Sequence, residues 1–259
     1  MGRWDMKVVT VAGPPSSGKT SAILKVADVL AEKGLRLAVV KFDCLSSSDE
    51  EVYAARGIPS ITGVSANMCP DHYYATNIER GIDWAAELGV DVLFNESAGL
   101  CNRCSPHIAG MPAVCVVDCL SGSRTPSKIG PMLRLADLVI VTKGDIVSQA
   151  EREVFAHEVR TVNPQARIAF LNGITGQGAS SVARFVQQAA TLGAHGGTDG
   201  CSTCENAEPA QAEPMRLRFT MPSALCSYCM GQTKVGRDYQ MGAVREMDVH
   251  RAAGKGSAR

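Results

Sequence analysis

The chain has 259 residues, of which 45% are hydrophobic and 20% are charged. This apolar fraction can bury a full core, and the length suits one α/β domain with a short appendage. The 26 basic side chains balance the 26 acidic ones, which argues against a general nucleic-acid binder because such proteins need a basic surface. No apolar run is long enough to span a membrane, and the first residues lack an apolar signal core. We therefore expect a cytoplasmic protein without nucleic-acid or membrane partners.

Apolar runs of strand length alternate with helical patterns as far as residue 192. Strands are expected, in chain order, over residues 7–12, 35–42, 90–96, 113–119, 137–143 and 166–172. Helices are expected over about 20–33, 71–88 and 179–192, and Ser148 with Glu151 forms a capping box ahead of another helix. Short apolar strands separated by helices indicate a mostly parallel sheet covered on both faces, which is an α/β fold of three layers. Ligands of such sheets bind at the carboxyl ends of the strands.

The composition changes after Leu192. Residues 193–200 are rich in glycine, and residues 205–214 are polar and rich in alanine and proline, as in linkers and weakly structured segments. Residues 216–220 form a candidate short strand. We therefore divide the chain into a P-loop domain over residues 1–193 and a linker with a small Cys-rich segment over residues 194–259.

Residues 13–20, GPPSSGKT, match a Walker A loop directly after the first expected strand. Backbone N–H groups of such a loop face the phosphates of a nucleotide, and the following helix adds a favourable dipole. Lys19 is expected to bridge the β- and γ-phosphates, and the Thr20 hydroxyl to bind Mg²⁺. Further nucleotide contacts are expected from Gly13, Ser16, Ser17, Gly18 and Ser21. The predicted fold is therefore that of a P-loop NTPase.

Later loops suggest the base and the catalytic carboxylates. Residues 142–145, TKGD, match the [NT]-K-x-D element, in which the carboxylate, here Asp145, accepts two N–H donors from guanine, and Lys143 belongs to the same element. Asn172 begins a loop after the last strand, where a base-lining segment is expected. Asp43 and Glu96 end two strands and are placed to meet Mg²⁺ and the attacking water, although a lone acidic residue there is often only a helix cap. GTP hydrolysis is thus the predicted activity.

Together these motifs resemble the nickel-insertion GTPases, meaning the urease accessory and hydrogenase-maturation GTPases of the SIMIBI class. The resemblance covers about residues 6–192. It is carried by GPPSSGKT, Asp43 with Asp49, RGIP (56–59), Gly63, Cys69-Pro70, NESAG (95–99), Asp118, KIGP (128–131), TKGD and NGITGQG (172–178). It implies a homodimeric GTPase that delivers a metal to a client metalloenzyme and contacts the γ-phosphate through Gly99. The chain departs from the family at Thr142, where the family has Asn, at Ala98, and in its C-terminal Cys segment.

The segment Cys69-Pro70-Asp71-His72 stands where the related GTPases carry Cys-Pro-His or Cys-His. By this resemblance the loop binds Ni²⁺ or Zn²⁺, often with ligands from two subunits. Thiolate and imidazole ligands suit both ions, and one Cys69 with one His72 from each of two copies would give four ligands. The inserted Asp71 changes the spacing to His72.

Six of the ten cysteines form three C-x-x-C pairs, which in a reducing compartment indicate metal or redox chemistry. The first pair, Cys101 with Cys104, follows Gly99 closely, so a metal there would sense the γ-phosphate. Two copies of this pair across a dimer axis would supply four thiolates for Zn²⁺ or a [4Fe–4S] cluster, and His107 could replace one of them. Cys115 and Cys119 are assigned to core packing, and the role of Cys44 stays open.

The other two pairs are Cys201 with Cys204 and Cys226 with Cys229. Their separation resembles that of a zinc ribbon, in which the metal supplies the folding energy of a small segment. The alternative is a flexible thiol arm that collects a metal or cluster and hands it to the loop beside the nucleotide. The residues alone leave both open.

The leading hypothesis is a GTP-hydrolysing metallochaperone with Lys19, Asp43 and Glu96 in catalytic roles, whose cargo is nickel, zinc or a metal cluster. The alternative is an iron–sulfur ATPase or activator, in which a dimer-bridging cluster passes electrons under nucleotide control. A third hypothesis is a non-metal chaperone GTPase of the cobalamin-mutase type, with structural cysteines.

Overall fold

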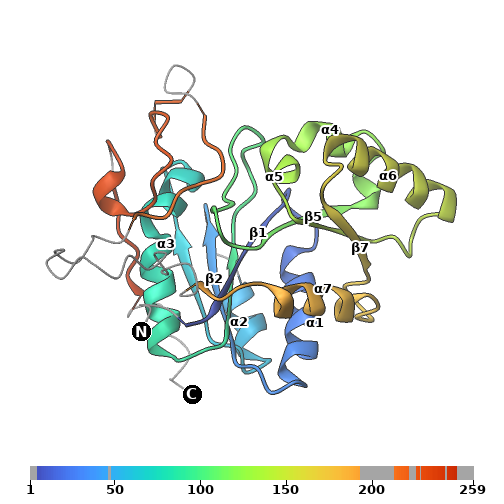
Figure 1. Cartoon of the computed structure of the whole chain (residues 1–259), viewed down its shortest axis with the longest axis horizontal. Coiled ribbons are helices and arrows are strands. Elements are labelled where there is room, and N and C mark those ends of the chain that lie inside the picture. Colours follow the sequence, from blue (N-terminus) through green and yellow to red (C-terminus); the bar gives the residue numbers. More distant parts are fainter. Residues whose placement is uncertain are drawn as a thin grey trace, which may run out of the picture.

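The computed structural model describes residues 5–45, 48–192, 213–221, 226–227, 229–242 and 244–249. Its centre is a seven-stranded sheet in the order β3-β2-β4-β1-β5-β6-β7, and every neighbouring pair runs parallel. The strands are β1 (Lys7–Ala12), β2 (Leu37–Asp43), β3 (Ser60–Val64), β4 (Val92–Glu96), β5 (Ala113–Asp118), β6 (Leu138–Thr142) and β7 (Arg167–Leu171). The predicted α/β fold with a parallel sheet is confirmed (Figure 1).

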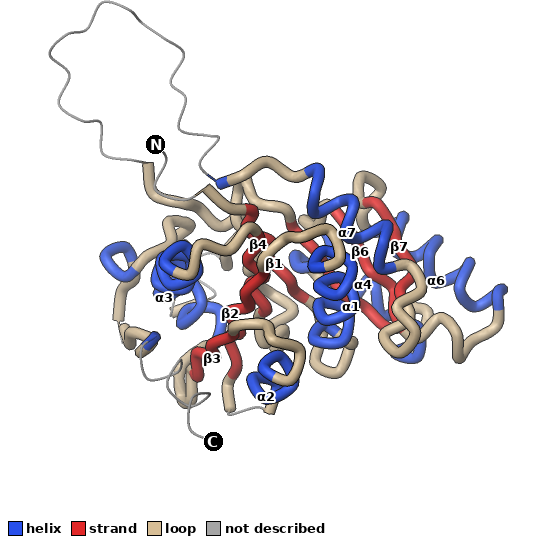
Figure 2. Tube along the Cα trace, turned by 90° about the horizontal axis from the view of Figure 1, so that it is seen from below, coloured by secondary structure: helices blue, strands red, loops and turns tan. Residues whose placement is uncertain are grey.

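Helices cover both faces of the sheet, as the right-handed crossovers of parallel strands require. One face packs against α1 (Lys19–Ala31) and α7 (Ala179–Gln188). The other face packs against α3 (Pro70–Glu87), α5 (Pro131–Arg134) and α6 (Gln149–Val162). The short helices α2 (Asp49–Ala54) and α4 (Thr125–Ile129) follow β2 and β5. Figure 2 shows α2 and α3 on opposite sides of β2.

The structure adds four elements to the expected ones, namely α2, β3, α4 and α5, and removes another. Strand β3 was not predicted because it is an edge strand with alternating burial rather than a continuous apolar run. The predicted strand at residues 216–220 is wrong, since only isolated bridges form at Arg216 and Leu217. The capping box is confirmed: the Ser148 Oγ accepts from the Glu151 N–H at 3.2 Å, and the Glu151 carboxylate accepts from the Ser148 N–H at 2.9 Å.

The described part of the C-terminal segment lies beside α3 (Figure 1). Val235 and Met247 are buried and belong to the same apolar cluster as Tyr73 of α3 and Phe42 of β2. The Asn77 side chain adds two hydrogen bonds, because its Nδ2 donates to the Arg245 carbonyl at 2.9 Å and its Oδ1 accepts from the Met247 N–H at 2.6 Å. This segment is therefore packed onto the core of the P-loop domain. The predicted linker over residues 193–200 lies outside the described residues.

Among the helices that the structure describes, none combines the length and the apolar character needed to cross a bilayer.

Candidate nucleotide and metal site

The loop between β1 and α1 has the backbone of a phosphate cradle. Gly13 has a φ of +144°, and a Cβ there would lie 2.1 Å from the carbonyl oxygen of Val116, so only glycine fits. The Lys19 ammonium donates to the Gly13 and Pro14 carbonyls at 3.0 Å, and burial lowers its pKa. The Ser17 hydroxyl is buried and has no hydrogen-bond partner among the described residues. These groups converge where the sequence predicts the phosphates.

Oxygen ligands gather beside this loop, at the ends of β2 and β4. The Thr20 hydroxyl lies 3.1 Å from Glu96 Oε1 and 3.3 Å from Asp49 Oδ2, and donates to them. Burial raises the pKa of Glu96, while Lys41 and Lys19 oppose that rise. A hydroxyl and carboxylates so close together form a donor set of the kind that Mg²⁺ prefers. The residues expected to hold Mg²⁺ therefore fit it, with Asp49 as an addition to the predicted set.

Lys41 links the carboxylates to one another. Its ammonium pairs with Asp49 and lies 3.6 Å from Asp43 Oδ2 and 3.6 Å from Glu96 Oε1. Asp43 therefore joins the group that Thr20 and Glu96 form. Lys41 was not predicted as a site residue, although its position two residues before Asp43 on a strand places both side chains on one face.

A further missed residue is Tyr53 of α2, whose hydroxyl donates to Glu96 Oε2 at 2.9 Å. Burial and the Glu96 charge raise the pKa of Tyr53, so it stays a donor. It holds one carboxylate oxygen of Glu96 and leaves the other directed at Thr20. Nothing in the sequence pattern indicated this contact, because α2 itself was not predicted.

The predicted base loops border the cradle. The Thr142 hydroxyl donates to the Ser17 carbonyl at 2.7 Å, so Thr142 supports the P-loop directly. The Lys143 ammonium donates to the Ser16 carbonyl at 2.9 Å. Asp145 is exposed at the end of β6, where its carboxylate is accessible to a ligand. The guanine-reading role of Asp145 stays a prediction.

Asn172 shapes its own loop. Its Oδ1 accepts from the N–H groups of Ile174 and Thr175 at 2.8 and 3.0 Å. The next residue, Gly173, packs against α1, since a Cβ there would lie 3.1 Å from the Cβ of Ser21. The loop thus lies beside the first turn of α1, and its contacts with a nucleotide stay predictions.

The loop after β4 is wedged between the P-loop and α5. Gly99 has a φ of +71°, and a Cβ there would lie 1.7 Å from the carbonyl oxygen of Gly13. On the other side, a Cβ on Gly130 would lie 2.2 Å from the carbonyl oxygen of Asn102. Both glycines allow backbone to approach backbone. Residues 99–102 are therefore fixed against the cradle, and Cys101 lies within this stretch.

Three ligand atoms meet at the end of that loop. The side chains of Asp71, Cys101 and Cys104 offer a carboxylate oxygen and two sulfurs that all lie within 4.8 Å of one another. Asp71 comes from the first turn of α3, whose N-cap is Cys69. Burial raises the pKa of Cys104 and of Cys69, and raises that of Asp71 to about 6. In the sequence Asp71 stands out only as an insertion between Pro70 and His72, whereas its position beside Cys101 and Cys104 makes it a candidate ligand.

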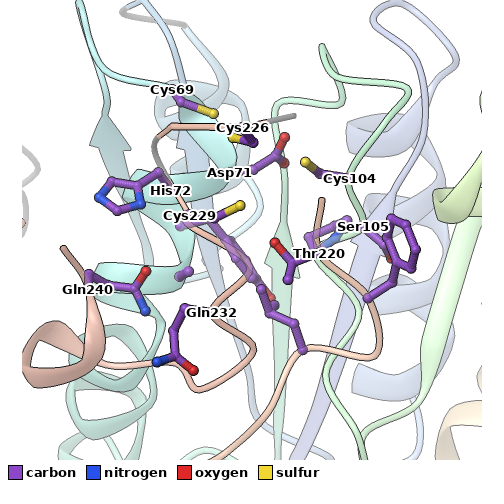
Figure 3. Close-up of a pocket in the computed structure, with 15 residues that line it drawn as sticks. Cys69, Asp71, His72, Cys104, Ser105, Thr220, Cys226, Cys229, Gln232 and Gln240 are labelled. Atoms are coloured by element: carbon purple, nitrogen blue, oxygen red, sulfur yellow. The ribbon is translucent and has the colours of Figure 1, made fainter. Parts of the chain in front are cut away.

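Two more sulfurs line the same cavity. Cys226 and Cys229 border it together with Cys69, Asp71 and Cys104. Figure 3 shows the sulfurs of Cys104 and Cys229 and the carboxylate of Asp71 turned toward a common space. The cavity has a volume of about 20 Å³, which is room for one water-sized species. Cys201 and Cys204 lie outside the described residues, so the zinc ribbon stays a prediction.

Two histidines, His107 and His72, were expected as possible metal ligands. His107 is fully buried, its Nδ1 lies 2.9 Å from Thr10 Oγ1 and its Nε2 donates to the Met132 carbonyl at 2.9 Å. With both ring nitrogens engaged and a pKa lowered by burial to about 4, His107 is a packing residue, and its suggested role as a ligand is wrong. The His72 ring points away from the sulfurs in Figure 3, and its role as a ligand stays a prediction.

Two of the remaining cysteines behave as expected. Cys115 in β5 is fully buried, and Cys119 is 9% exposed in the turn that follows. Both belong to the apolar cluster beneath α5 and α6. Their predicted role in core packing is confirmed.

Known proteins resemble the chain in both sequence and fold. Residues 7–170 match the CobW/HypB/UreG nucleotide-binding domain. The uncharacterized protein MJ0120 of Methanocaldococcus jannaschii is 42% identical over 243 residues, which cover 94% of this chain and 97% of the relative.

Two solved structures share the fold. HypB from Helicobacter pylori in complex with nickel aligns with a TM-score of 0.58 at 20% identity, covering 71% of this chain and 86% of that one. The hydrogenase maturation factor HypB from Archaeoglobus fulgidus aligns with a TM-score of 0.54 at 20% identity, covering 71% and 89%. The chain belongs to the CobW/HypB/UreG family of P-loop nucleotide-binding proteins.

Proposed function

We propose that the protein is a GTP-hydrolysing metallochaperone, which binds a metal ion beside its nucleotide and delivers it to a client metalloenzyme. One observation carries this proposal: a single short loop joins the two sites. Gly99 lies against Gly13 of the P-loop, and Cys101, two residues later, lies with Asp71 and Cys104. A shift of Gly99 on loss of the γ-phosphate has to displace Cys101, which is how nucleotide switches order and release segments.

The residues of the cradle suit phosphoryl transfer to water. Lys19 is placed to turn from its carbonyl partners to the β- and γ-phosphates, and Ser17 offers a free hydroxyl to them. Thr20, Asp43 and Glu96, with Asp49, would hold Mg²⁺, which neutralises phosphate charge when bound. Glu96 is held by Tyr53 and Thr20 and is the candidate to orient the attacking water.

The base loop supports GTP over ATP. Asp145 is exposed at the end of β6, where its carboxylate can accept two N–H donors of guanine. Thr142, which replaces the asparagine of the family motif, still anchors the P-loop through the Ser17 carbonyl. The substitution therefore keeps the scaffold of the guanine-reading element.

The cavity supports a single ion as the cargo. Sulfur and carboxylate ligands suit Zn²⁺ and Ni²⁺, and nickel is the metal in the related H. pylori HypB structure. A cavity of about 20 Å³ within one chain has room for one such ion. The number of thiols around the cavity is what favours the alternative, an iron–sulfur ATPase or activator.

The test measures Ni²⁺ and Zn²⁺ affinity of anaerobically purified protein with GDP and with a non-hydrolysable GTP analogue. We expect binding at least tenfold tighter with the analogue, because the GTP state is the loaded state of the cycle. The double variant Cys101→Ser/Cys104→Ser should lose this binding, while Cys44→Ser, a half-buried thiol outside the cavity lining, serves as the control.

Equal metal affinity in all nucleotide states, or a protein that hydrolyses no nucleotide, would overturn the proposal. A brown protein that absorbs near 400 nm would instead support the iron–sulfur alternative.

A further inference from the structure

We infer that Cys226 and Cys229 complete the metal site within one chain, so that these two thiols join Asp71, Cys101 and Cys104 around one ion. This inference rests on the proposed metal binding and deepens it, because it names the ligand set. It differs from a zinc ribbon, in which the pair would serve Cys201 and Cys204. It also differs from a site shared by two subunits, since one chain then supplies all the ligands.

The backbone presents the pair at a turn. The Leu217 N–H donates to the Thr233 carbonyl at 2.7 Å, and the Gln232 N–H donates to the Cys229 carbonyl at 2.8 Å. Met230 has a φ of +50° and Gly231 a φ of +74°, the left-handed values that the two central residues of a tight hairpin turn adopt. Cys229 therefore sits at the start of a defined turn.

Protein contacts hold both sides of this turn in place without a metal. On one side Arg218 donates to both carboxylate oxygens of Asp137 at 2.8 Å, and also to the carbonyls of Leu135, Met111 and Ile108. On the other side Val235 is fully buried, and the Gly236 N–H donates to the Ala75 carbonyl of α3 at 2.8 Å. Because these contacts already fix Arg218 and residues 232–236 on either side of the pair, binding an ion costs less conformational entropy.

The groups that line the cavity beneath the turn suit a bound cation. Asp71 Oδ2 is buried and has no hydrogen-bond partner among the described residues, and such an oxygen costs free energy unless a donor or a cation meets it. The sulfurs of Cys69, Cys104, Cys226 and Cys229 line this cavity, and the sulfur of Cys101 lies within 4.8 Å of the ligand atoms of Asp71 and Cys104. One carboxylate oxygen and several thiolates around a volume for one ion fit a divalent metal of borderline softness, such as Zn²⁺, Ni²⁺ or Co²⁺.

The experiment titrates Co²⁺ into the full chain under anaerobic conditions and records the sulfur-to-cobalt charge-transfer band. We expect one ion per chain in dilute monomeric protein. Cys226→Ser/Cys229→Ser should weaken Co²⁺ binding at least tenfold and lower the band, whereas Cys201→Ser/Cys204→Ser should change neither. We expect the quadruple variant, with Cys101, Cys104, Cys226 and Cys229 all replaced by Ser, to lose one Co²⁺ ion per chain and not two, because both cysteine pairs bind the same ion. Unchanged GTP affinity shows that the variants fold.

A second measurement needs no substitution. Bound Zn²⁺ should protect Cys101, Cys226 and Cys229 of the natural chain from alkylation, read by mass spectrometry, and leave Cys201 and Cys204 reactive.

Three results would overturn the inference: half an ion per chain, equal losses in the two C-terminal double variants, or no protection of Cys226 and Cys229. If metal binding at Cys101 and Cys104 still responds to the nucleotide in those cases, the proposed function stands and only this ligand set fails.

Discussion

Gly99 is the residue at which the nucleotide loop and the metal loop touch. In a Gly99→Ala variant the new Cβ would lie 1.7 Å from the carbonyl oxygen of Gly13, and the φ of +71° adds strain. The loop has to move away from the cradle. We therefore expect at least a tenfold loss of GTP hydrolysis, and a metal affinity that no longer depends on the nucleotide.

The matched control for this variant is Gly34→Ala. Gly34 has a similar φ of +79°, but a Cβ there meets nothing within 4 Å. It carries the same backbone strain, about 1–2 kcal/mol, without the collision. Hydrolysis assays and metal titrations of the two variants separate the contact from general destabilisation, and equal activities would refute a coupling role for Gly99.

Asp71 should make the free energy of unfolding of the metal-free protein depend on pH. Burial raises its pKa to about 6, against about 3.9 in an unfolded chain. Between these values the folded state keeps a proton that the unfolded state has lost, so the free energy of unfolding falls as pH rises from about 4 to about 6. The loss amounts to about 3 kcal/mol at most, since one pKa unit is worth about 1.4 kcal/mol.

Urea unfolding with a chelator, from pH 4 to pH 7, checks this expectation. An Asp71→Asn variant should show a flatter pH profile than the natural chain, because the amide does not titrate. Glu153→Gln, at an exposed position of α6, is the control and should leave the profile unchanged. If the Asp71→Asn profile matched that of the natural chain, the burial of this carboxylate would not govern the pH response.

At the scale of single residues, local motifs can be recognised in the sequence, but contacts between residues far apart in the chain cannot. GPPSSGKT dictates its own loop, because glycines and the following helix form the cradle locally. Lys41, Tyr53 and Asp71 were missed as site residues because each acts through contacts between distant segments. Asp71, for instance, lies near the thiol of Cys101, thirty positions later in the chain.

Helices and strands show the same difference between local patterns, which the sequence predicts, and long-range contacts, which it does not. Continuous apolar runs predicted six strands within a few residues, whereas edge strand β3, in which only every second residue is buried, gave too weak a signal. The spacing of the C-x-x-C pairs suggested that the two C-terminal pairs belong together. Cys201 and Cys204 lie outside the described residues, so this pairing stays a prediction. Cys226 and Cys229 line the same cavity as Cys104. Contacts of Arg218 and Val235 hold the neighbouring residues on the P-loop domain, and sequence periodicity does not report such docking.

Arg218 makes the largest set of polar contacts between the C-terminal residues that the structure describes and the P-loop domain. An Arg218→Ala variant loses the bidentate pair with Asp137 and the bonds to three carbonyls. We expect the segment over residues 213–242 to be less firmly held, by about 2 kcal/mol, since hydrogen bonds to charged groups contribute on that order. Hydrogen exchange or limited proteolysis of this segment should become at least tenfold faster, and metal affinity should fall with it.

Arg216→Ala is the control, because Arg216 lies two residues earlier and its side chain makes one long contact, at 3.4 Å, with Thr233. It should leave protection of the segment nearly unchanged. Equal exchange rates in both variants would show that apolar contacts alone, such as those of Val235, hold the element.

At the scale of the whole molecule, the parallel sheet collects every motif at one edge. The carboxyl ends of β1, β4, β5 and β6 carry the P-loop, the Gly99 loop, Asp118 and Asp145. The same edge exposes Leu45 after β2 and Leu120 after β5, which are 74% and 52% exposed. We propose that this edge forms a homodimer when the nucleotide binds, with Leu120 in the interface.

Leu120→Glu tests the proposed nucleotide-dependent homodimer. If two chains meet at this edge, a buried carboxylate without a partner should weaken dimerisation with a GTP analogue and metal at least a hundredfold, by light scattering on a gel-filtration column. Val154→Glu is the matched control, since Val154 is also 52% exposed but lies on α6. Dimers that form equally well in both variants would place the interface elsewhere. Loaded monomers that keep one ion per chain in the Leu120→Glu variant would separate metal binding from dimer formation, as a ligand set within one chain requires.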